Sequence, residues 1–141
     1  MAEALTADQL AQTHLAAFSK GRAWTSAEFT SLLQSPLVFA HGDNRCFALV
    51  RVVADEAELL TLATHPDHQR HGLARGLMED WHRVAQQRGA QHAFLEVAAD
   101  NSAARRLYDT CAYETVATRP GYYARSDGPD VDALVMRHAF V

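Results

Sequence analysis

Apolar positions along the chain recur with two different periods, which predict two kinds of element. Helical spacing predicts three helices in chain order, over residues 7–21, 25–36 and 73–89. A capping box, in which a threonine is followed three residues later by glutamine or glutamate, marks the start of the first two. We expect the first helix to begin at about Ala7 and to end at Gly21. The third carries the most sustained amphipathic pattern and ends at Gly89.

The second period is that of strands. Apolar runs bounded by turn residues predict strands over residues 37–40, 46–53, 59–64, 93–97, 116–123 and 131–136. The turn signal at 41–44 joins the first two as a hairpin, and an acidic turn at 54–56 leads into the third. Strand 59–64, the long helix and strand 93–97 have the order of a parallel βαβ unit. A further helix follows the cap residue Asn101. The pattern therefore predicts an α/β fold with a mixed sheet.

Length and charge narrow the class of protein. The 141 residues suit a single domain over 1–141, and 48% apolar residues can supply its core. The net charge of −4 gives no basic footprint for nucleic acid. No apolar run approaches the roughly 20 residues of a membrane span, and the first residues lack the pattern of a secretory signal. With two cysteines in no metal-ligand spacing, a cytoplasmic protein without a disulfide framework is expected.

The segment that leads into the long helix is a candidate phosphate site. It reads Gln69-Arg70-His71-Gly72-Leu73-Ala74, and Arg75 follows. Free amides and the positive end of the helix dipole favour an anion at such a start, and a glycine lets that anion approach the backbone. An ordinary strand-to-helix turn with solvated arginines has the same spacing. It also lacks the lysine of a nucleotide-triphosphate loop.

Several stretches together resemble the GCN5-related N-acetyltransferase (GNAT) superfamily. They cover about half the chain and are residues 58–66, 69–74, 95–104, Leu107-Tyr108 and 119–123. Leu-Glu-Val followed by Asn, Leu-Tyr and Tyr-Tyr at these intervals is typical of the RimI type, which acetylates the N-terminal alanine of a small-subunit ribosomal protein. The resemblance implies a GNAT fold: a mixed central sheet with a splayed parallel strand pair, flanked by helices on both faces.

The resemblance also implies acetyl-CoA as co-substrate, bound where the two parallel strands splay apart. The pyrophosphate is expected on the amides of Gln69, Arg70, His71, Gly72, Leu73, Ala74 and Arg75. The backbone of Leu62, Ala63 and Thr64 is expected to pair with the pantetheine arm. Asn101 is expected to bond the same arm, although its capping role alone explains an asparagine there.

Two residues are candidates for proton transfer. Glu96 lies between Leu95 and Val97, where an unpartnered carboxylate is costly to bury. As a general base it would deprotonate an α-amine, whose pKa is about 8; the alternative is a carboxylate on the solvated face of a strand. Tyr108 lies on the apolar stripe of its helix, which suits a core aromatic. In the family the equivalent tyrosine is the general acid that protonates the leaving coenzyme A thiolate.

The acceptor is less well defined than the co-substrate. The resemblance points to the N-terminal tail of a ribosomal protein or another peptide amine, with Trp24 and Tyr122 as candidate acceptor-binding residues. A small-molecule amine, another protein, or a catalytically silent acyl-CoA-binding module are the alternatives; the presence of Glu96 and Tyr108 argues against the last. The sequence indicates no oligomeric state.

Three departures from the family pattern bear on these expectations. Fewer residues than usual precede the first helix, so the family's first strand is expected to be missing or very short. Ala98 replaces an arginine. Ala112 replaces a glycine at a helix end where a left-handed conformation is expected.

The spacing of His65, His68 and His71 suggests a metal site, which we do not expect. Three-residue spacing brings side chains to one face only on a helix, and Pro66 prevents a helix through this loop. No cysteine or acidic cluster completes a closed ligand set in the sequence around it. No metal is therefore expected.

Overall fold

The computed structural model describes residues 5–18, 23–69 and 72–140. In chain order its elements are α1 (Ala7–Ala17), α2 (Ser26–Leu33), β1 (Val38–Gly42), β2 (Cys46–Val53), β3 (Glu56–Thr64), a 3-10 turn (Pro66–His68), α3 (Leu73–Gln87), β4 (His92–Ala98), α4 (Ser102–Thr110), β5 (Glu114–Tyr123) and β6 (Val131–Ala139). Among these helices none combines the length and apolar character needed to cross a bilayer.

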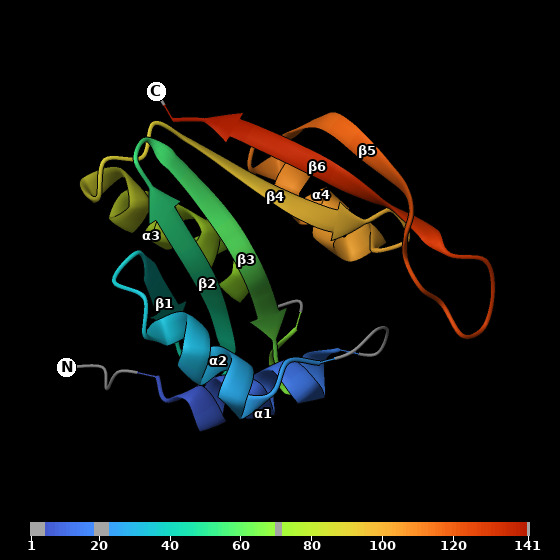
Figure 1. Ribbon diagram of the computed structural model, residues 1–141, viewed down its shortest axis with the longest axis horizontal. Helices are drawn as coiled ribbons and strands as arrows, with labels where there is room; N and C mark the ends of the chain where they lie inside the picture. The colour runs from blue at the N-terminus through green and yellow to red at the C-terminus, as the bar shows by residue number, and fades with distance from the viewer. Residues whose placement is uncertain (1–4, 19–22, 70–71, 141) are drawn as a thin grey trace.

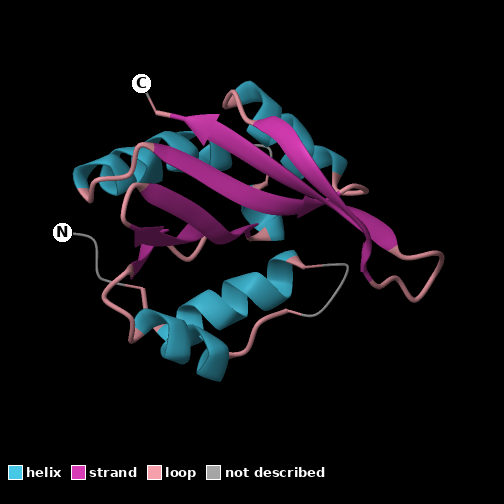
Figure 2. Cartoon of the chain, turned by 45° about the horizontal axis from the view of Figure 1, so that its top comes forward, coloured by secondary structure: helices cyan, strands magenta, loops and turns pink. Residues whose placement is uncertain are grey.

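One six-stranded mixed sheet, in the order β1-β2-β3-β4-β6-β5, forms the centre of the fold. Only the β3–β4 pair is parallel in the part of the chain that is described, and α3 is its crossover. Helices α3 and α4 cover one face, and α1 and α2 cover the other face beside β1–β3 (Figures 1 and 2). The α/β class, the mixed sheet and helices on both faces are confirmed.

The capping boxes set the starts of α1 and α2 as the sequence predicts. The Thr6 side chain accepts the backbone N–H of Gln9, and the Gln9 side chain accepts the N–H of Thr6. Thr25 and Glu28 repeat the arrangement at α2. Free N–H groups of the first turn are thereby bonded.

The predicted end of the first helix at Gly21 is wrong, because α1 ends at Ala17. Phe18 takes an extended conformation, and its ring stacks on the imidazole of His14 at 3.9 Å between centroids. Gly21 lies outside the described residues. The expectation of a missing first strand concerns residues that include 1–4, which also lie outside them.

Two predicted turns are shorter in the structure. His41 and Gly42 belong to the β1–β2 ladder, so the hairpin turn comprises only residues 43–45. Gly42 has φ +114°, and a Cβ there would lie 2.3 Å from the carbonyl oxygen of Cys46, so only glycine fits. Glu56 belongs to β3 rather than to the acidic turn, because it pairs with both Val53 and His92.

The parallel pair is short and then diverges. The β3–β4 ladder runs from Glu56 opposite His92 to Leu59 opposite Leu95 and stops there, although both strands continue. The stop coincides with a β-bulge, because Leu49 pairs with Thr61 whereas the next residue, Val50, pairs with Leu59. Leu60 is the extra residue. Figure 1 shows β3 and β4 separating toward their arrowheads, and the splayed pair is confirmed.

Candidate active site

The first turn of α3 offers backbone amides beside the diverging strands. Its N-cap is Gly72, with φ +76° and ψ 5°, and no side chain caps the helix there, whereas Thr6, Thr25 and Asn101 cap the other three α-helices of the described chain. The first intrahelical bond is from the Gly76 N–H to the Gly72 carbonyl, 3.3 Å. No side chain of the described residues caps the three amides between them, so they can bind an anion.

The predicted phosphate residues divide between this turn and the loop before it. Gly72 and Arg75 are exposed, and Leu73 and Ala74 pack partly against the core under α3. The Gln69 side chain donates to the Thr64 carbonyl at 3.2 Å and so ties the loop to the end of β3. Arg70 and His71 lie outside the described residues, and the predictions for them stay untested.

An open backbone edge follows the bulge in β3. On one side Leu62, Ala63 and Thr64 pair with β2. On the other side no described strand pairs with residues 60–64 once the parallel ladder has stopped at Leu59. Alternate peptide groups along this edge are directed toward the gap, where an amide-containing ligand can bond them.

Glu96 lies on β4, one residue beyond the end of the parallel ladder. Its neighbours Leu95 and Val97 are buried under α3 and α4, so strand alternation directs Glu96 to the opposite face, where 27% of its side chain is exposed. Arg119 of β5 forms an ion pair with it, Nη2 to Oε1 3.1 Å. Burial, together with the nearby Glu96 carboxylate, raises the pKa of Tyr123.

Tyr108 belongs to the core under α3 and α4. Only 6% of it is exposed, and its ring lies 5.9 Å from that of Tyr113. Burial raises the pKa of the Tyr108 hydroxyl, so this group stays protonated and able to donate at neutral pH. The core placement inferred from helical spacing is confirmed; the acid role stays a prediction.

Asn101 caps α4 as predicted, since its Oδ1 accepts the Ala104 N–H at 3.2 Å. Asn101 is exposed, so its side chain can also form a hydrogen bond to a ligand. The capping role is confirmed, and contact with the pantetheine arm stays a prediction.

Tyr122 projects from an irregular stretch of β5. The β5–β6 register breaks between Arg119 and Tyr123, and Asp132 Oδ1 accepts the Gly121 N–H at 2.9 Å inside the break. Tyr122 is 53% exposed, and the Arg119 guanidinium lies 5.3 Å from its ring centre. The aromatic side chain therefore stands on the surface beside the Glu96–Arg119 pair.

Trp24 lies just before α2 and packs against the apolar cluster between α1, α2 and the sheet. It is half-buried, with its ring 5.6 Å from that of Phe29. Two shallow hollows of about 270 and 280 Å³ flank it: Ala11, Gln12, Leu15, Ala23 and Thr25 line one, and Glu28, Ser31 and Leu32 line the other. A partly exposed indole between two hollows is suited to hold a ligand side chain.

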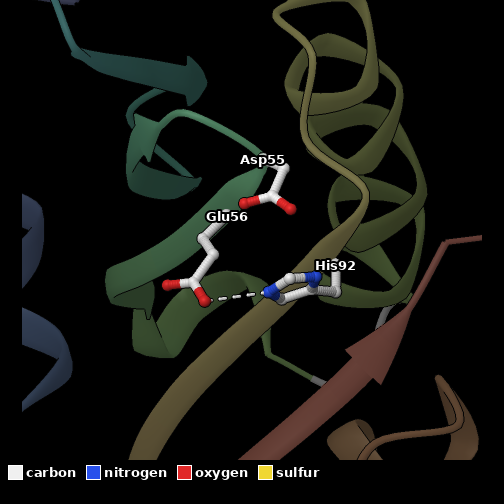
Figure 3. A group of neighbouring side chains, drawn as sticks. All are labelled: Asp55, Glu56 and His92. Atoms are coloured by element: carbon white, nitrogen blue, oxygen red, sulfur yellow. Dashed lines mark hydrogen bonds and ion pairs between the residues drawn. The ribbon is translucent and has the colours of Figure 1, made fainter.

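A second polar group, which sequence reasoning missed, lies at the opposite end of the β3–β4 pair (Figure 3). It contains Asp55, Glu56 and His92, whose candidate ligand atoms lie within 4.8 Å of one another. The imidazole of His92 and the Glu56 carboxylate face each other at 3.0 Å. Asp55 and Glu56 are neighbours in sequence, whereas His92 is 36 residues from Glu56, and the parallel register brings it to them. The hydrogen bond reinforces the first rung of that ladder.

The histidine loop has local partners. His65 Nδ1 accepts the Asp67 N–H at 3.2 Å, and the ring centres of His65 and His68 are 6.0 Å apart. His71 lies outside the described residues. The His65 and His68 imidazoles therefore make contacts within the loop that leads to α3.

A mixed sheet whose parallel pair splays beside an uncapped helix start is the GNAT arrangement. The chain belongs to the acetyltransferase (GNAT) family, whose sequence model matches residues 8–113.

Several relatives of the chain carry the same name. The [ribosomal protein bS18]-alanine N-acetyltransferase of Escherichia coli K12 is 40% identical over 96 residues, which are 68% of this chain and 64% of that protein. The enzyme of the same name from Haemophilus ducreyi is 32% identical over 124 residues, 87% of this chain and 83% of that one. The crystal structure of the ribosomal-protein-S18-alanine N-acetyltransferase from E. coli superposes with a TM-score of 0.86 at 30% identity, over 97% of this chain and 91% of that one.

Proposed function

We propose that this protein is an acetyl-CoA-dependent N-acetyltransferase that acetylates the N-terminal α-amine of a ribosomal protein. The observation that carries the proposal is the open β3 edge next to the uncapped start of α3, in a member of the GNAT family. The α-amine as acceptor is supported by the names of the relatives, which are ribosomal-protein alanine N-acetyltransferases.

The pyrophosphate of acetyl-CoA binds at the start of α3. The amides of Leu73, Ala74 and Arg75 donate to it, and the left-handed Gly72 lets it approach the backbone. Gln69, Arg70 and His71 complete the loop. The pantetheine arm pairs with the backbone of residues 62–64 and is bonded by Asn101, as an added strand pairs with a sheet edge.

Glu96 acts as the general base. An α-amine with a pKa of about 8 is mostly protonated at neutral pH, so it must give up a proton before it attacks the thioester carbonyl. Glu96 takes this proton through water. Its position supports the role, since the carboxylate is partly exposed at the point where β4 leaves β3.

Tyr108 acts as the general acid. When the amine nitrogen bonds to the carbonyl carbon, the carbon–sulfur bond breaks and leaves coenzyme A as a thiolate. The Tyr108 hydroxyl gives its proton to the sulfur. Burial keeps this phenol protonated until it is needed, because the raised pKa disfavours the phenolate in the free enzyme.

The acceptor peptide lies between Trp24 and Tyr122. Both side chains are aromatic and accessible, one beside two hollows and the other beside Glu96 and its ion-pair partner. The net charge of the chain, −4, is compatible with a basic ribosomal-protein tail but is too small to select one.

A peptide array with radiolabelled acetyl-CoA tests the proposal. It carries peptides with a free N-terminal alanine and a basic tail, the same peptides blocked at the N-terminus but containing lysine, and a parallel reaction with small amines. We expect label only on the free α-amines. Label on lysine or on small amines alone would replace the proposed acceptor class, and the absence of transfer to every acceptor would overturn the enzymatic proposal.

A further inference from the structure

His14 is a buried polar residue for which the proposed chemistry has no direct use. Its side chain is fully buried on α1. Aromatic rings surround it: Phe18 stacks on it, and Phe29 meets it edge-on at 5.5 Å between centroids. An imidazole among apolar rings is costly unless both ring nitrogens have hydrogen-bond partners.

Two hydrogen bonds fix the ring and its tautomer. The backbone N–H of Trp24 donates to Nδ1 at 3.0 Å, and Nε2 lies 3.0 Å from the Oγ1 of Thr61. Because a backbone N–H can only donate, Nδ1 carries the lone pair. The neutral ring therefore bears its proton on Nε2 and donates it to Thr61.

Thr61 is the residue that follows the β3 bulge. Leu59 faces the core under α3, and regular alternation would direct Thr61 to the same face. The extra residue Leu60 reverses this, so that Thr61 faces α1 and meets His14. Residues 62–64, the part of the open 60–64 edge proposed for the pantetheine arm, follow directly after Thr61. The His14 bond thus fixes the residue of that edge that precedes them.

Trp24 is held by the other nitrogen of the same ring. Its backbone N–H is anchored on α1, which sets where the indole stands between its two hollows. A single imidazole therefore connects the strand edge proposed for the pantetheine arm with the aromatic residue proposed for the acceptor.

We propose that His14 is a positioning residue that sets both walls of the acetyl-transfer site, the β3 edge through Thr61 and the acceptor side through Trp24. The inference rests on the proposed function. It extends that function, because it makes cofactor affinity and acceptor affinity depend on one residue that touches neither ligand.

The neighbouring Thr13 supplies a matched control. It lies on the same helix, is 3% exposed, and its Oγ1 donates to the Asn44 carbonyl at 2.7 Å. That bond leads to the β1–β2 turn rather than to β3 or Trp24. Thr13→Val and Thr61→Val thus each remove one buried hydroxyl of similar size, at positions that differ in what they hold.

The experiment measures three quantities for each variant: the Kd for acetyl-CoA by calorimetry, the KM for an alanine-started peptide, and the free energy of unfolding. Loss of one buried hydrogen bond typically corresponds to a roughly five- to tenfold change in an equilibrium constant. His14→Phe, which keeps a ring but loses both bonds, should raise Kd and KM by about that factor. Thr61→Val should raise Kd and leave KM unchanged. Thr13→Val should lower stability and change neither.

A double variant adds a check on the path. If His14 acts on the cofactor wall through Thr61, His14→Phe with Thr61→Val should have the same acetyl-CoA Kd as His14→Phe alone. Should His14→Phe fail to fold, the near-isosteric Thr61→Val decides the cofactor arm, and His14→Gln, whose amide retains one donor and one acceptor, decides the acceptor arm by a smaller rise in KM.

Three outcomes would overturn the inference. Folded His14 and Thr61 variants with wild-type Kd and KM overturn it alone, and so does a Thr13→Val variant whose Kd and KM rise as much as those of His14→Phe. A wild-type protein that binds no acetyl-CoA overturns the proposed function and this inference with it.

Discussion

Glu96 and Arg119 form an ion pair although they lie on two strands that are not neighbours in the sheet. Glu96 is on β4 and Arg119 on β5, with β6 between them, and their ion pair of 3.1 Å spans that strand on its exposed face. The carboxylate proposed as general base thus has a cationic partner before any amine arrives. A partly exposed pair of this kind contributes little to stability, so its main effect is on the position of the carboxylate.

Glu96→Gln should lower turnover by about 10² to 10⁴ at neutral pH, because the amide keeps the shape of the side chain but cannot accept a proton. Acetyl-CoA affinity should barely change. Raising the pH supplies neutral amine from solution, so much of the rate should return by about pH 9, above the amine pKa of about 8. A pH–rate profile with a basic peptide measures this.

Glu58→Gln is the matched control, since Glu58 is also a strand glutamate paired with an arginine, Arg51, at 2.6 Å. It should keep the wild-type profile. Wild-type turnover of Glu96→Gln across pH 6 to 9 would mean that another group removes the proton.

Tyr108→Phe should lower turnover roughly 10²-fold or more and change the free energy of unfolding by about 1 kcal/mol, because only the proton donor is lost. Tyr113→Phe provides the comparison. Its hydroxyl bonds His82 at 2.8 Å, so that variant should lose stability but keep its turnover. Near-normal turnover of Tyr108→Phe would leave Tyr108 a core aromatic only.

Gly72→Val should weaken acetyl-CoA binding by more than it lowers stability. A Cβ at Gly72 meets no atom within 4 Å, so the cost of folding comes from the positive φ, about 1 to 2 kcal/mol. The affinity loss comes from a side chain placed where the phosphate approaches. Gly89→Val imposes a similar strain, φ +100°, at the other end of α3 and should leave the calorimetric Kd unchanged. Equal affinities of the two variants would remove the loop from the cofactor site.

His82 should make stability depend on pH. Burial and the neighbouring His138 lower the pKa of His82 from 6.5 to about 4. The free energy of unfolding therefore has its full value above pH 6.5 and decreases as the pH falls toward 4. Over that range the unfolded chain binds a proton at His82 that the folded chain does not. The loss is up to about 2 to 3 kcal/mol by pH 4.

Urea unfolding between pH 4 and 7 measures this dependence. The slope of the unfolding free energy against pH gives the number of protons taken up on unfolding, and His82→Gln should lower that number by close to one. An unchanged slope in that variant would show that His82 already titrates normally in the folded protein.

Ala112→Gly should stabilise the protein by about 0.5 to 1 kcal/mol, because relief of left-handed strain outweighs the added freedom of glycine in the unfolded chain. Ala112 has φ +65°, which confirms the left-handed helix end inferred from the family pattern. Thermal unfolding tests it, and a lower melting temperature would contradict the strain.

Local chemistry explains which features were predictable from the sequence. Thr6 and Thr25 act on amides three residues away, so the capping boxes set the helix starts without help from the rest of the chain. The βαβ order likewise predicted the parallel pair. The divergence of that pair came only from the resemblance, because nothing near Leu60 in sequence marks it as the extra residue of a bulge.

Contacts between distant segments account for what was missed. His14 lies on α1, but its hydrogen-bond partner Thr61 is 47 residues away, and no local pattern joins the two. Arg119 was part of a motif without a role, and only the strand order brings it to Glu96. The predicted helix end at Gly21 was wrong for a local reason, because Phe18 takes an extended conformation directly after Ala17 and stacks its ring on His14.

The open stretch of β3 also bears on how the molecule avoids aggregation. Unpaired strand edges are templates for association with other chains, and proteins usually blunt or cover them. Here residues 60–64 lie in the middle of the strand order, with β2 on one side and β4 diverging on the other, while β1 and β5 form the two outer edges. A strand of another molecule would have to enter between β3 and β4 to pair with this edge, whereas a thin linear ligand needs much less room. Bonding capacity is thus kept available for a small molecule while protein strands are largely excluded.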